Sequence, residues 1–229
     1  MQDIDDNDKY SWFAAEIDTF EAGIYLMNNL LLVTLEILVV VDLPLILLYL
    51  RGNWPVHTTV LCLLSIPVLW YLTYAPLHEL SHMAGTCLAG GTIADYKLIP
   101  RFWLGEVQIA WITPVGLTQP WQQLVMTASP YILDAVSILA GVFVLRKGFS
   151  RNPFLLGLVF MLLCLRPTFD IVCEVISLLS GFRGDLYHIQ AIVGVIATWF
   201  FLMLAAGLAL FSIVTILRRF RGYPETATN

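Results

Sequence analysis

Five apolar runs, each long enough to cross a lipid bilayer, dominate this chain. A transmembrane helix needs about 20 predominantly apolar residues, and runs of that length lie at 24–50, 58–89, 121–145, 153–179 and 187–217. The 229 residues are 59% hydrophobic and only 13% charged, whereas about 25% of residues in a soluble domain are charged. Because a bilayer offers no water to exposed backbone groups, such runs must be helical. The sequence therefore predicts an all-α polytopic membrane protein with about five transmembrane helices.

The segment 91–120, between the second and third runs, is more polar and richer in Gly and Pro than its neighbours. Within it, Val107, Ile109 and Trp111 alternate with Glu, Gln and Ala in the stretch GEVQIAWIT, which begins at residue 105. A two-residue period is typical of a β-strand. We therefore expect a β-hairpin or small sheet in this region, at one face of the membrane.

The apolar runs divide the chain into three parts. Residues 1–23 form an acidic N-terminal arm, residues 24–217 the transmembrane domain, and residues 218–229 a short C-terminal tail. The fourth run should be interrupted at Pro167, in the stretch LRPTFD, because proline removes a helical hydrogen bond.

The basic residues predict the orientation of the chain in the membrane. Five crossings place Arg51, Arg146, Lys147, Arg151, Arg218, Arg219 and Arg221 on one side, and Lys9, Lys97, Arg101 and Arg183 on the other. Since Lys and Arg concentrate in cytoplasmic loops, the first side should be cytoplasmic, with the C-terminus, and the N-terminus extracytoplasmic. The net charge is −5 and no basic stripe interleaves with aromatic residues, so a nucleic-acid partner is excluded.

The most specific motif of the chain lies near the end of the second run, where His78, Glu79 and His82 stand in HELSH. On a helix, His78 and His82 share one face and can hold one metal ion, and Glu79 can take a proton from metal-bound water. Ionisable side chains within a membrane span are costly and mark functional sites. The motif predicts a metal centre, against the alternative that backbone carbonyls satisfy two structural histidines.

A catalytic zinc site needs a third protein ligand, and the sequence offers Asp170 and Asp185. Counted along straight helices from the cytoplasmic side, the histidines lie about 30–36 Å deep, Asp170 about 26 Å and Asp185 about 50 Å. Depth therefore favours Asp170, with Asp185 as the competing ligand. The structural alternatives are an ion pair between Asp170 and Arg166 and a helix N-cap at Asp185. Glu174, one turn beyond Asp170, is a candidate acceptor for a ligating histidine.

The arrangement resembles the site-2 protease family of membrane-embedded zinc metallopeptidases, in particular its compact and divergent branch. The resemblance rests on HELSH at 78–82 in an apolar helix, the polar hairpin region that follows, and TASPYILDAV at 127–136 at the start of the next run. Ser129 and Pro130 there are similar to a degenerate form of the family's Gly-Pro pair. The likeness covers roughly residues 58–190.

This resemblance implies that two histidines and a distant aspartate hold Zn²⁺, with Glu79 as the general base. It also supports Asp185 as the third ligand, because GDLYHIQAIV looks like the aspartate-bearing start of the last helix in the divergent branch. Two departures stand out: Leu133 occupies the place of the family's asparagine, and the chain has no Leu-Asp-Gly motif.

Taken together, these features predict an intramembrane zinc metalloprotease, a hydrolase that cleaves peptide bonds of transmembrane protein substrates in the lipid bilayer. Glu79 would activate a zinc-bound water, and the strand at 105–113 would pair with an unwound substrate segment. Two alternatives stay open. One is a catalytically inactive zinc-binding pseudoprotease that holds client proteins. The other is a small transporter that uses the same carboxylates as a relay.

Overall fold

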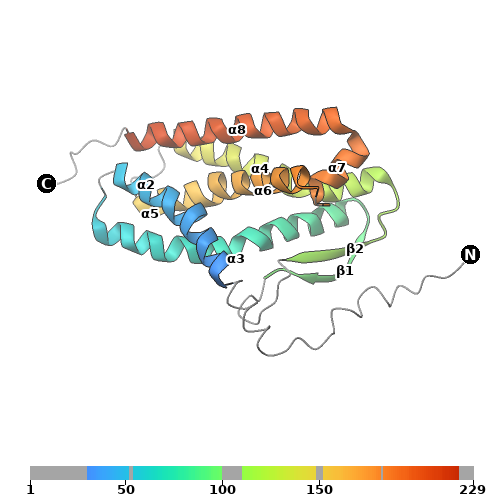
Figure 1. The fold of residues 1–229 in the computed structure, drawn as a ribbon, viewed down its shortest axis with the longest axis horizontal. Coiled ribbons are helices and arrows are strands. Elements are labelled where there is room, and N and C mark those ends of the chain that lie inside the picture. The colour runs from blue at the N-terminus through green and yellow to red at the C-terminus, as the bar shows by residue number, and fades with distance from the viewer. Residues whose placement is uncertain (1–29, 52–53, 100–109, 148–151, 182, 222–229) are drawn as a thin grey trace, which may run out of the picture.

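The computed structural model describes residues 30–51, 54–99, 110–147, 152–181 and 183–221 (Figure 1). Five helices in this part of the chain are long and apolar enough to cross a membrane: Leu30–Leu50, Val56–Leu88, Pro120–Arg146, Phe154–Leu179 and Val195–Arg218. A two-stranded antiparallel sheet lies between the second and third of them in the sequence. The predicted fold class, an all-α polytopic membrane protein with a small hairpin, is confirmed. The predicted N-terminal arm lies outside the described residues.

Most of the elements follow one another after short connections, the segment between β1 and β2 being the exception. In chain order they are η3 (Ile37–Asp42), α2 (Leu43–Arg51), α3 (Val56–Leu88), β1 (Thr92–Lys97), β2 (Trp111–Val115), α4 (Pro120–Arg146), α5 (Pro153–Phe160), η5 (Met161–Leu165), α6 (Arg166–Leu179), α7 (Asp185–Val193) and α8 (Val195–Arg221). The π-helical segment η3 and the helix α2 continue one another and belong to the first crossing, Leu30–Leu50.

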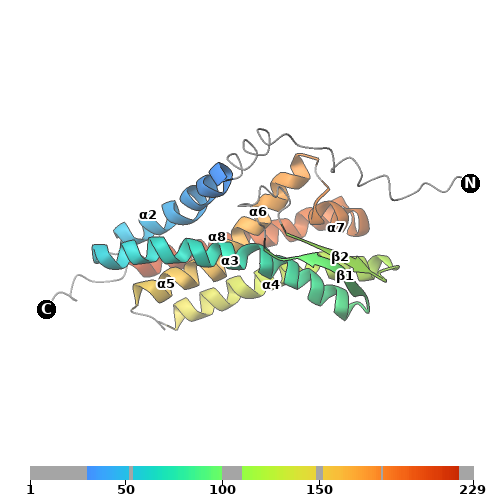
Figure 2. The same ribbon diagram turned by 90° about the horizontal axis from the view of Figure 1, so that it is seen from below.

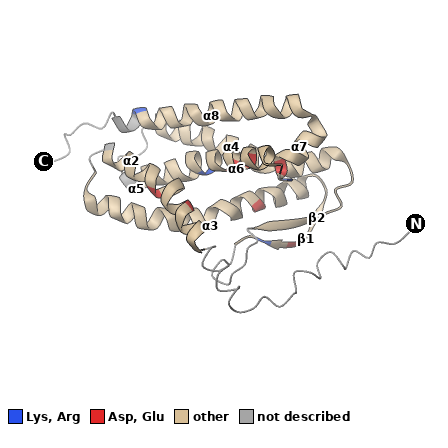
Figure 3. Ribbon diagram, viewed as in Figure 1, with Lys and Arg blue, Asp and Glu red and all other residues tan. Residues whose placement is uncertain are grey.

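The outward faces of these helices are made of apolar side chains. Leu64 on α3, Ile132 on α4 and Met203 on α8 are all more than half exposed, and Figure 3 shows that the helices carry few charged residues. A water-soluble protein of this size would not leave so large an apolar surface uncovered. This surface suits the hydrocarbon interior of a bilayer.

Close contact between the first, second and fourth crossings forms one of two buried apolar clusters. Tyr49, Ile66 and Met161 are almost fully buried in it. Gly157 on α5 faces Tyr49 and Ile66 so closely that a Cβ atom there would collide with both side chains. The absence of a side chain at this position therefore lets α5 approach the first two crossings.

The fourth crossing is interrupted where the sequence predicts. The π-helical turn η5 stands between α5 and α6, directly before Pro167 at the start of α6. Proline has no N–H to donate to the preceding turn and its ring crowds that turn, and a wider π turn relieves both effects. The chain keeps helical dihedral angles through Leu165 and Arg166, so the helix is distorted and not broken.

The last apolar run, predicted as one helix over 187–217, is in fact two helices. Gly194 separates α7 from α8 with φ 87° and ψ 161°, a backbone conformation that is essentially confined to glycine. The straight-helix assumption behind the depth of Asp185 is thus wrong, because the chain changes direction at Gly194. Buried residues of α6, α7 and α8 then meet in the second apolar cluster: Ile171, Leu186, Ile189 and Leu202.

The hairpin begins directly after α3, whose end is closed by backbone hydrogen bonds around Gly90 (φ 82°). In the sheet, the register shifts by one residue between Ile93 and Asp95, opposite Pro114, which has no N–H for the ladder. The strand predicted at 105–113 is only partly observed: β2 starts at Trp111, and residues 105–109 lie outside the described part. Figures 1 and 2 place the sheet and α7 at the same end of the bundle.

Candidate metal centre

The two histidines of the HELSH motif lie together on α3. His78 and His82 are one helical turn apart, and their Nε2 atoms are 3.0 Å from each other. Both side chains are largely buried, with 16% and 7% of their surface exposed. The predicted common face of the helix is therefore present.

The hydrogen bonds of the other ring nitrogens decide which atoms carry protons. His82 Nδ1 lies 3.0 Å from the backbone carbonyl of Met126, and His78 Nδ1 lies 2.8 Å from Asp170 Oδ2. A carbonyl and a carboxylate only accept hydrogen bonds, so each Nδ1 is the donor. In a neutral imidazole the Nε2 atom then holds a lone pair. When both imidazoles are neutral, two lone pairs therefore face each other across 3.0 Å.

Close packing of α3 against α4 makes the contact with Met126 possible. A Cβ atom at Gly85, one turn beyond His82, would collide with Ser129 on α4. Ser129 donates its own hydroxyl to the carbonyl of Val125 at 2.6 Å and needs no other acceptor. The pair Ser129 and Pro130, picked out in the sequence, thus lies at the helix contact that orients His82.

Asp185 brings a carboxylate oxygen close to the Nε2 atoms of both histidines. Its Oδ2 lies 2.8 Å from His82 Nε2 and 3.3 Å from His78 Nε2. These three residues form a group whose ligand atoms could hold one metal ion. Burial by itself raises the pKa of Asp185, but imidazoles that carry a proton on Nε2 donate hydrogen bonds to this carboxylate, and in that state they hold its pKa well below its ordinary value.

The start of α7 is anchored so that Asp185 reaches the histidines. Glu174 Oε2 on α6 accepts a hydrogen bond from the backbone N–H of Leu186 at 3.3 Å. Gly184, directly before Asp185, lies so close to the Glu174 carboxylate that a side chain there would collide with it. We expected Glu174 to accept a hydrogen bond from a ligating histidine, but it accepts one from the backbone of the first turn of α7.

Asp170 also lies against the motif, although on the other side of the His78 ring. Its carboxylate meets Nδ1, while the carboxylate that converges with the two Nε2 atoms is that of Asp185. The depth argument that preferred Asp170 places this residue correctly beside His78. The depth calculated for Asp185 along a straight helix is wrong, because the turn at Gly194 brings α7 back against α6. Among the described residues, Asp185 is the aspartate whose carboxylate lies against both Nε2 atoms.

Glu79 follows His78 on α3 and is partly buried. Its carboxylate interacts electrostatically with His78, His82, Asp185 and Asp170. No hydrogen bond joins it to any residue in the described part of the chain. The carboxylate is therefore available to accept a proton beside the cluster.

A second charged contact lies behind this cluster, and no pattern in the sequence predicted it. Arg166 pairs with Asp134 on α4 at 2.7 Å, and both side chains are buried. Arg166 does not bond to Asp170, the partner one turn away on its own helix that the sequence suggested. The sequence does show ionisable residues in both of these apolar runs, which is unusual in membrane spans. It does not show which of these residues pair across helices.

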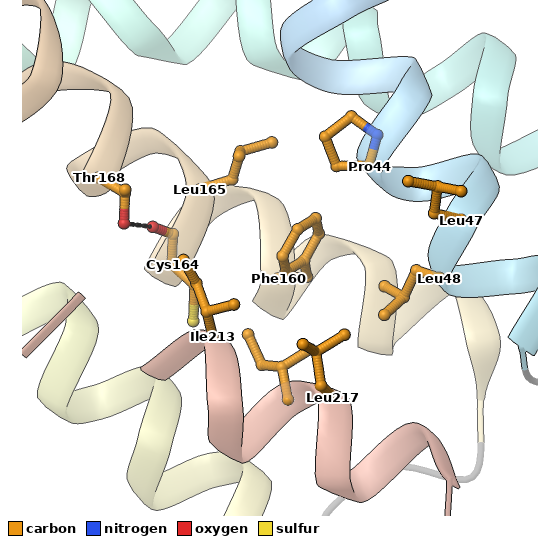
Figure 4. Close-up of a pocket in the computed structure, with 10 residues that line it drawn as sticks. Pro44, Leu47, Leu48, Phe160, Cys164, Leu165, Thr168, Ile213 and Leu217 are labelled. Atoms are coloured by element: carbon orange, nitrogen blue, oxygen red, sulfur yellow. Dashed lines mark hydrogen bonds between the residues drawn. The ribbon is translucent and has the colours of Figure 1, made fainter. Parts of the chain in front are cut away.

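Two hollows among the described helices are lined mainly by apolar side chains. Figure 4 shows one of about 370 Å³ between the first crossing, the fourth crossing and α8, where the Thr168 hydroxyl is satisfied by the carbonyl of Cys164 at 2.6 Å. Another, of about 570 Å³, lies between α4, α7 and α8, and its lining is almost wholly apolar. Neither is lined by a charged residue.

No protein-family model, no curated protein and no solved structure matches this chain. The fold and the site define its class: a five-helix membrane protein with a His-His-Asp cluster and a neighbouring glutamate among its helices.

Proposed function

We propose that this protein is a membrane-embedded zinc metalloprotease that hydrolyses peptide bonds of membrane-protein substrates. One observation carries the proposal: His78 Nε2, His82 Nε2 and Asp185 Oδ2, each able to give an electron pair to a cation, converge beside the carboxylate of Glu79. Electron-rich atoms at such distances repel one another unless a cation lies between them. A proton on one imidazole relieves part of this repulsion, whereas a divalent cation satisfies all three atoms together.

The chemistry of the three donor atoms fits zinc. Zinc binds imidazole nitrogen and carboxylate oxygen at about 2.0–2.2 Å, and a catalytic site keeps three protein ligands and one open position. At those lengths, neighbouring ligands of a tetrahedral ion lie about 3.3 Å apart, close to the separations of 2.8, 3.0 and 3.3 Å between these atoms. His78 and Asp185 keep 16% and 20% of their side-chain surface exposed, which supports an open side for water.

In this proposal each side chain has one task. His78, His82 and Asp185 hold the metal, and Met126 and Asp170 fix the two imidazoles through their Nδ1 atoms. When bound, zinc supplies a Lewis acid that brings the pKa of water toward neutrality. Glu79 accepts the proton that water gives up and returns it to the amine nitrogen of the cleaved peptide bond.

The choice of peptide substrates rests on the resemblance of HELSH and its surroundings to the site-2 protease family, and on the sheet. The strand β1 starts one short turn beyond α3, at the end of the helix that carries the motif, and β2 pairs with it. Among the described residues, β1 pairs only with β2, so each strand keeps one edge to which an extended segment can add. A substrate helix must unwind before cleavage, and this edge offers hydrogen-bond partners to the unwound backbone.

The test is the substitution Glu79→Gln in the purified protein. It should leave one zinc ion bound per chain, because the ligands are unchanged. It should also lower the cleavage rate of a fluorogenic transmembrane peptide by about 100-fold or more, the contribution of a general base. Glu36→Gln, the same change at a carboxylate that bonds Trp70 elsewhere in the bundle, should leave both values unchanged.

Two results would count against the proposal in different ways. A wild-type protein that binds no zinc would remove the metal centre. A Glu79→Gln variant that performs its cellular role fully, with zinc bound and without cleavage in either protein, would instead identify a zinc-binding protein that holds its clients.

A further inference from the structure

A buried ion pair lies behind the histidines, out of contact with the predicted metal position. Arg166 Nη2 donates to Asp134 Oδ1 at 2.7 Å, and the two side chains are 2% and 0% exposed. Arg166 opens α6, directly before Pro167, and Asp134 lies in the middle of α4. Both are therefore fixed to helices that enclose the cluster.

Stability alone is a poor reason for this pair. Removing two charges from water costs several kcal/mol per ion, and replacing a buried ion pair with apolar residues of similar volume is often neutral or even stabilising. In a membrane span no nearby water lowers the free-energy cost of burying a charge. Ionisable residues there are therefore rare and mark functional sites. The position of the pair indicates what it does.

The pair is linked to His78 through Asp170. Asp170 lies one turn beyond Arg166 on α6, its carboxylate interacts electrostatically with that of Asp134, and its Oδ2 accepts the Nδ1–H of His78 at 2.8 Å. Arg166, Asp134 and Asp170 thus form a charged group of neighbouring side chains on α4 and α6, and this group ends at His78 on α3. Two neighbouring acidic groups repel each other, and the positive charge of Arg166 offsets this repulsion.

We propose that Arg166 and Asp134 are positioning residues of the metal centre. By holding Asp170 against His78, they fix the tautomer and the direction of the imidazole, so that Nε2 stays aimed at the point it shares with His82 and Asp185. Groups that orient a ligating histidine in this way raise metal affinity about 10–100-fold. This inference rests on the proposed function, since it requires that a metal binds at that point.

The experiment compares zinc affinity in the full-length protein in detergent, measured by competition with a chromophoric chelator. The double variant Asp134→Leu/Arg166→Met replaces the pair with apolar side chains and should stay helical and monodisperse. It should bind zinc about 10–100-fold more weakly, and Co²⁺ added in its place should give an altered visible spectrum. The control Glu36→Gln removes the charge of a carboxylate that accepts a hydrogen bond from Trp70 at 3.2 Å elsewhere in the bundle. The amide oxygen still accepts this bond, and affinity and spectrum should stay unchanged.

The isosteric change Asp134→Asn covers the case in which the double variant does not fold. It keeps the volume of the side chain, removes its charge and should weaken zinc binding in the same direction by a smaller factor. If the double variant folds, wild-type zinc affinity and an unchanged Co²⁺ spectrum in it would overturn the inference. If it does not fold, the same result in a folded Asp134→Asn variant would do so. That result leaves the proposed function standing, whereas a wild-type protein that itself binds no zinc would remove both.

Discussion

At the residue scale, Asp185 and Asp170 contact opposite nitrogens of one imidazole, and their substitutions should separate two roles. Asp185→Ala removes a proposed ligand and should abolish zinc binding at micromolar metal. Asp170→Ala removes only the acceptor of His78 Nδ1–H and should weaken binding about 10–100-fold while keeping one zinc per chain at saturation. Zinc titration of both variants makes the comparison. His188→Ala, an exposed imidazole on the same helix as Asp185, should bind as the wild type does. The reverse pattern, with zinc lost only in Asp170→Ala, would restore Asp170 as the ligand.

At the element scale, the direction of α7 depends on one residue. Gly194 has a φ of 87° and ψ of 161°, and a side chain in this region costs about 1–3 kcal/mol. Gly194→Ala should therefore lower the thermal unfolding midpoint and weaken zinc binding, because α7 carries Asp185 on its first turn. Gly207→Ala is the matched control: it lies within α8, no atom lies within 4 Å of an added Cβ, and alanine favours a helix. Thermal unfolding of both variants with and without zinc gives the readout. Equal behaviour of the two variants would show that the turn at Gly194 does not position Asp185.

The helices also show which parts of the fold and of the candidate site could be predicted from the sequence. The crossings follow from run length alone, and the pairing of His78 with His82 follows from helical spacing, so both were predictable. The turn at Gly194 was not, because a single glycine in the apolar stretch IVGVIA is compatible with a continuous helix. That one turn changed the depth of Asp185 and with it the choice of ligand. The contact between Arg166 and Asp134 joins residues 32 positions apart, and helical periodicity carries no information about partners on other helices.

At the scale of the whole molecule, the proposed orientation fixes the side from which water reaches the metal. His82 lies six residues before the end of α3, or about 9 Å along the helix, so the cluster is near the membrane face that carries the sheet. Arg146, Lys147 and Arg218 lie at the opposite ends of their helices. Since basic residues accumulate on the cytoplasmic side, the sheet and the metal centre should face away from the cytoplasm.

Single cysteines report this orientation directly. In a chain with its four native cysteines replaced by serine or alanine, Ser180→Cys lies in the exposed turn after α6, on the side of the sheet, and Lys147→Cys lies in the exposed turn after α4. A membrane-impermeant maleimide added to intact cells should label Ser180→Cys and should label Lys147→Cys only after permeabilisation. The cysteine-free chain controls for background labelling. Labelling of Lys147→Cys alone in intact cells would show the reverse orientation. The proposed metal centre would then exchange water and product with the cytoplasm, since Glu79 and the proposed zinc ligands lie near the sheet in either case.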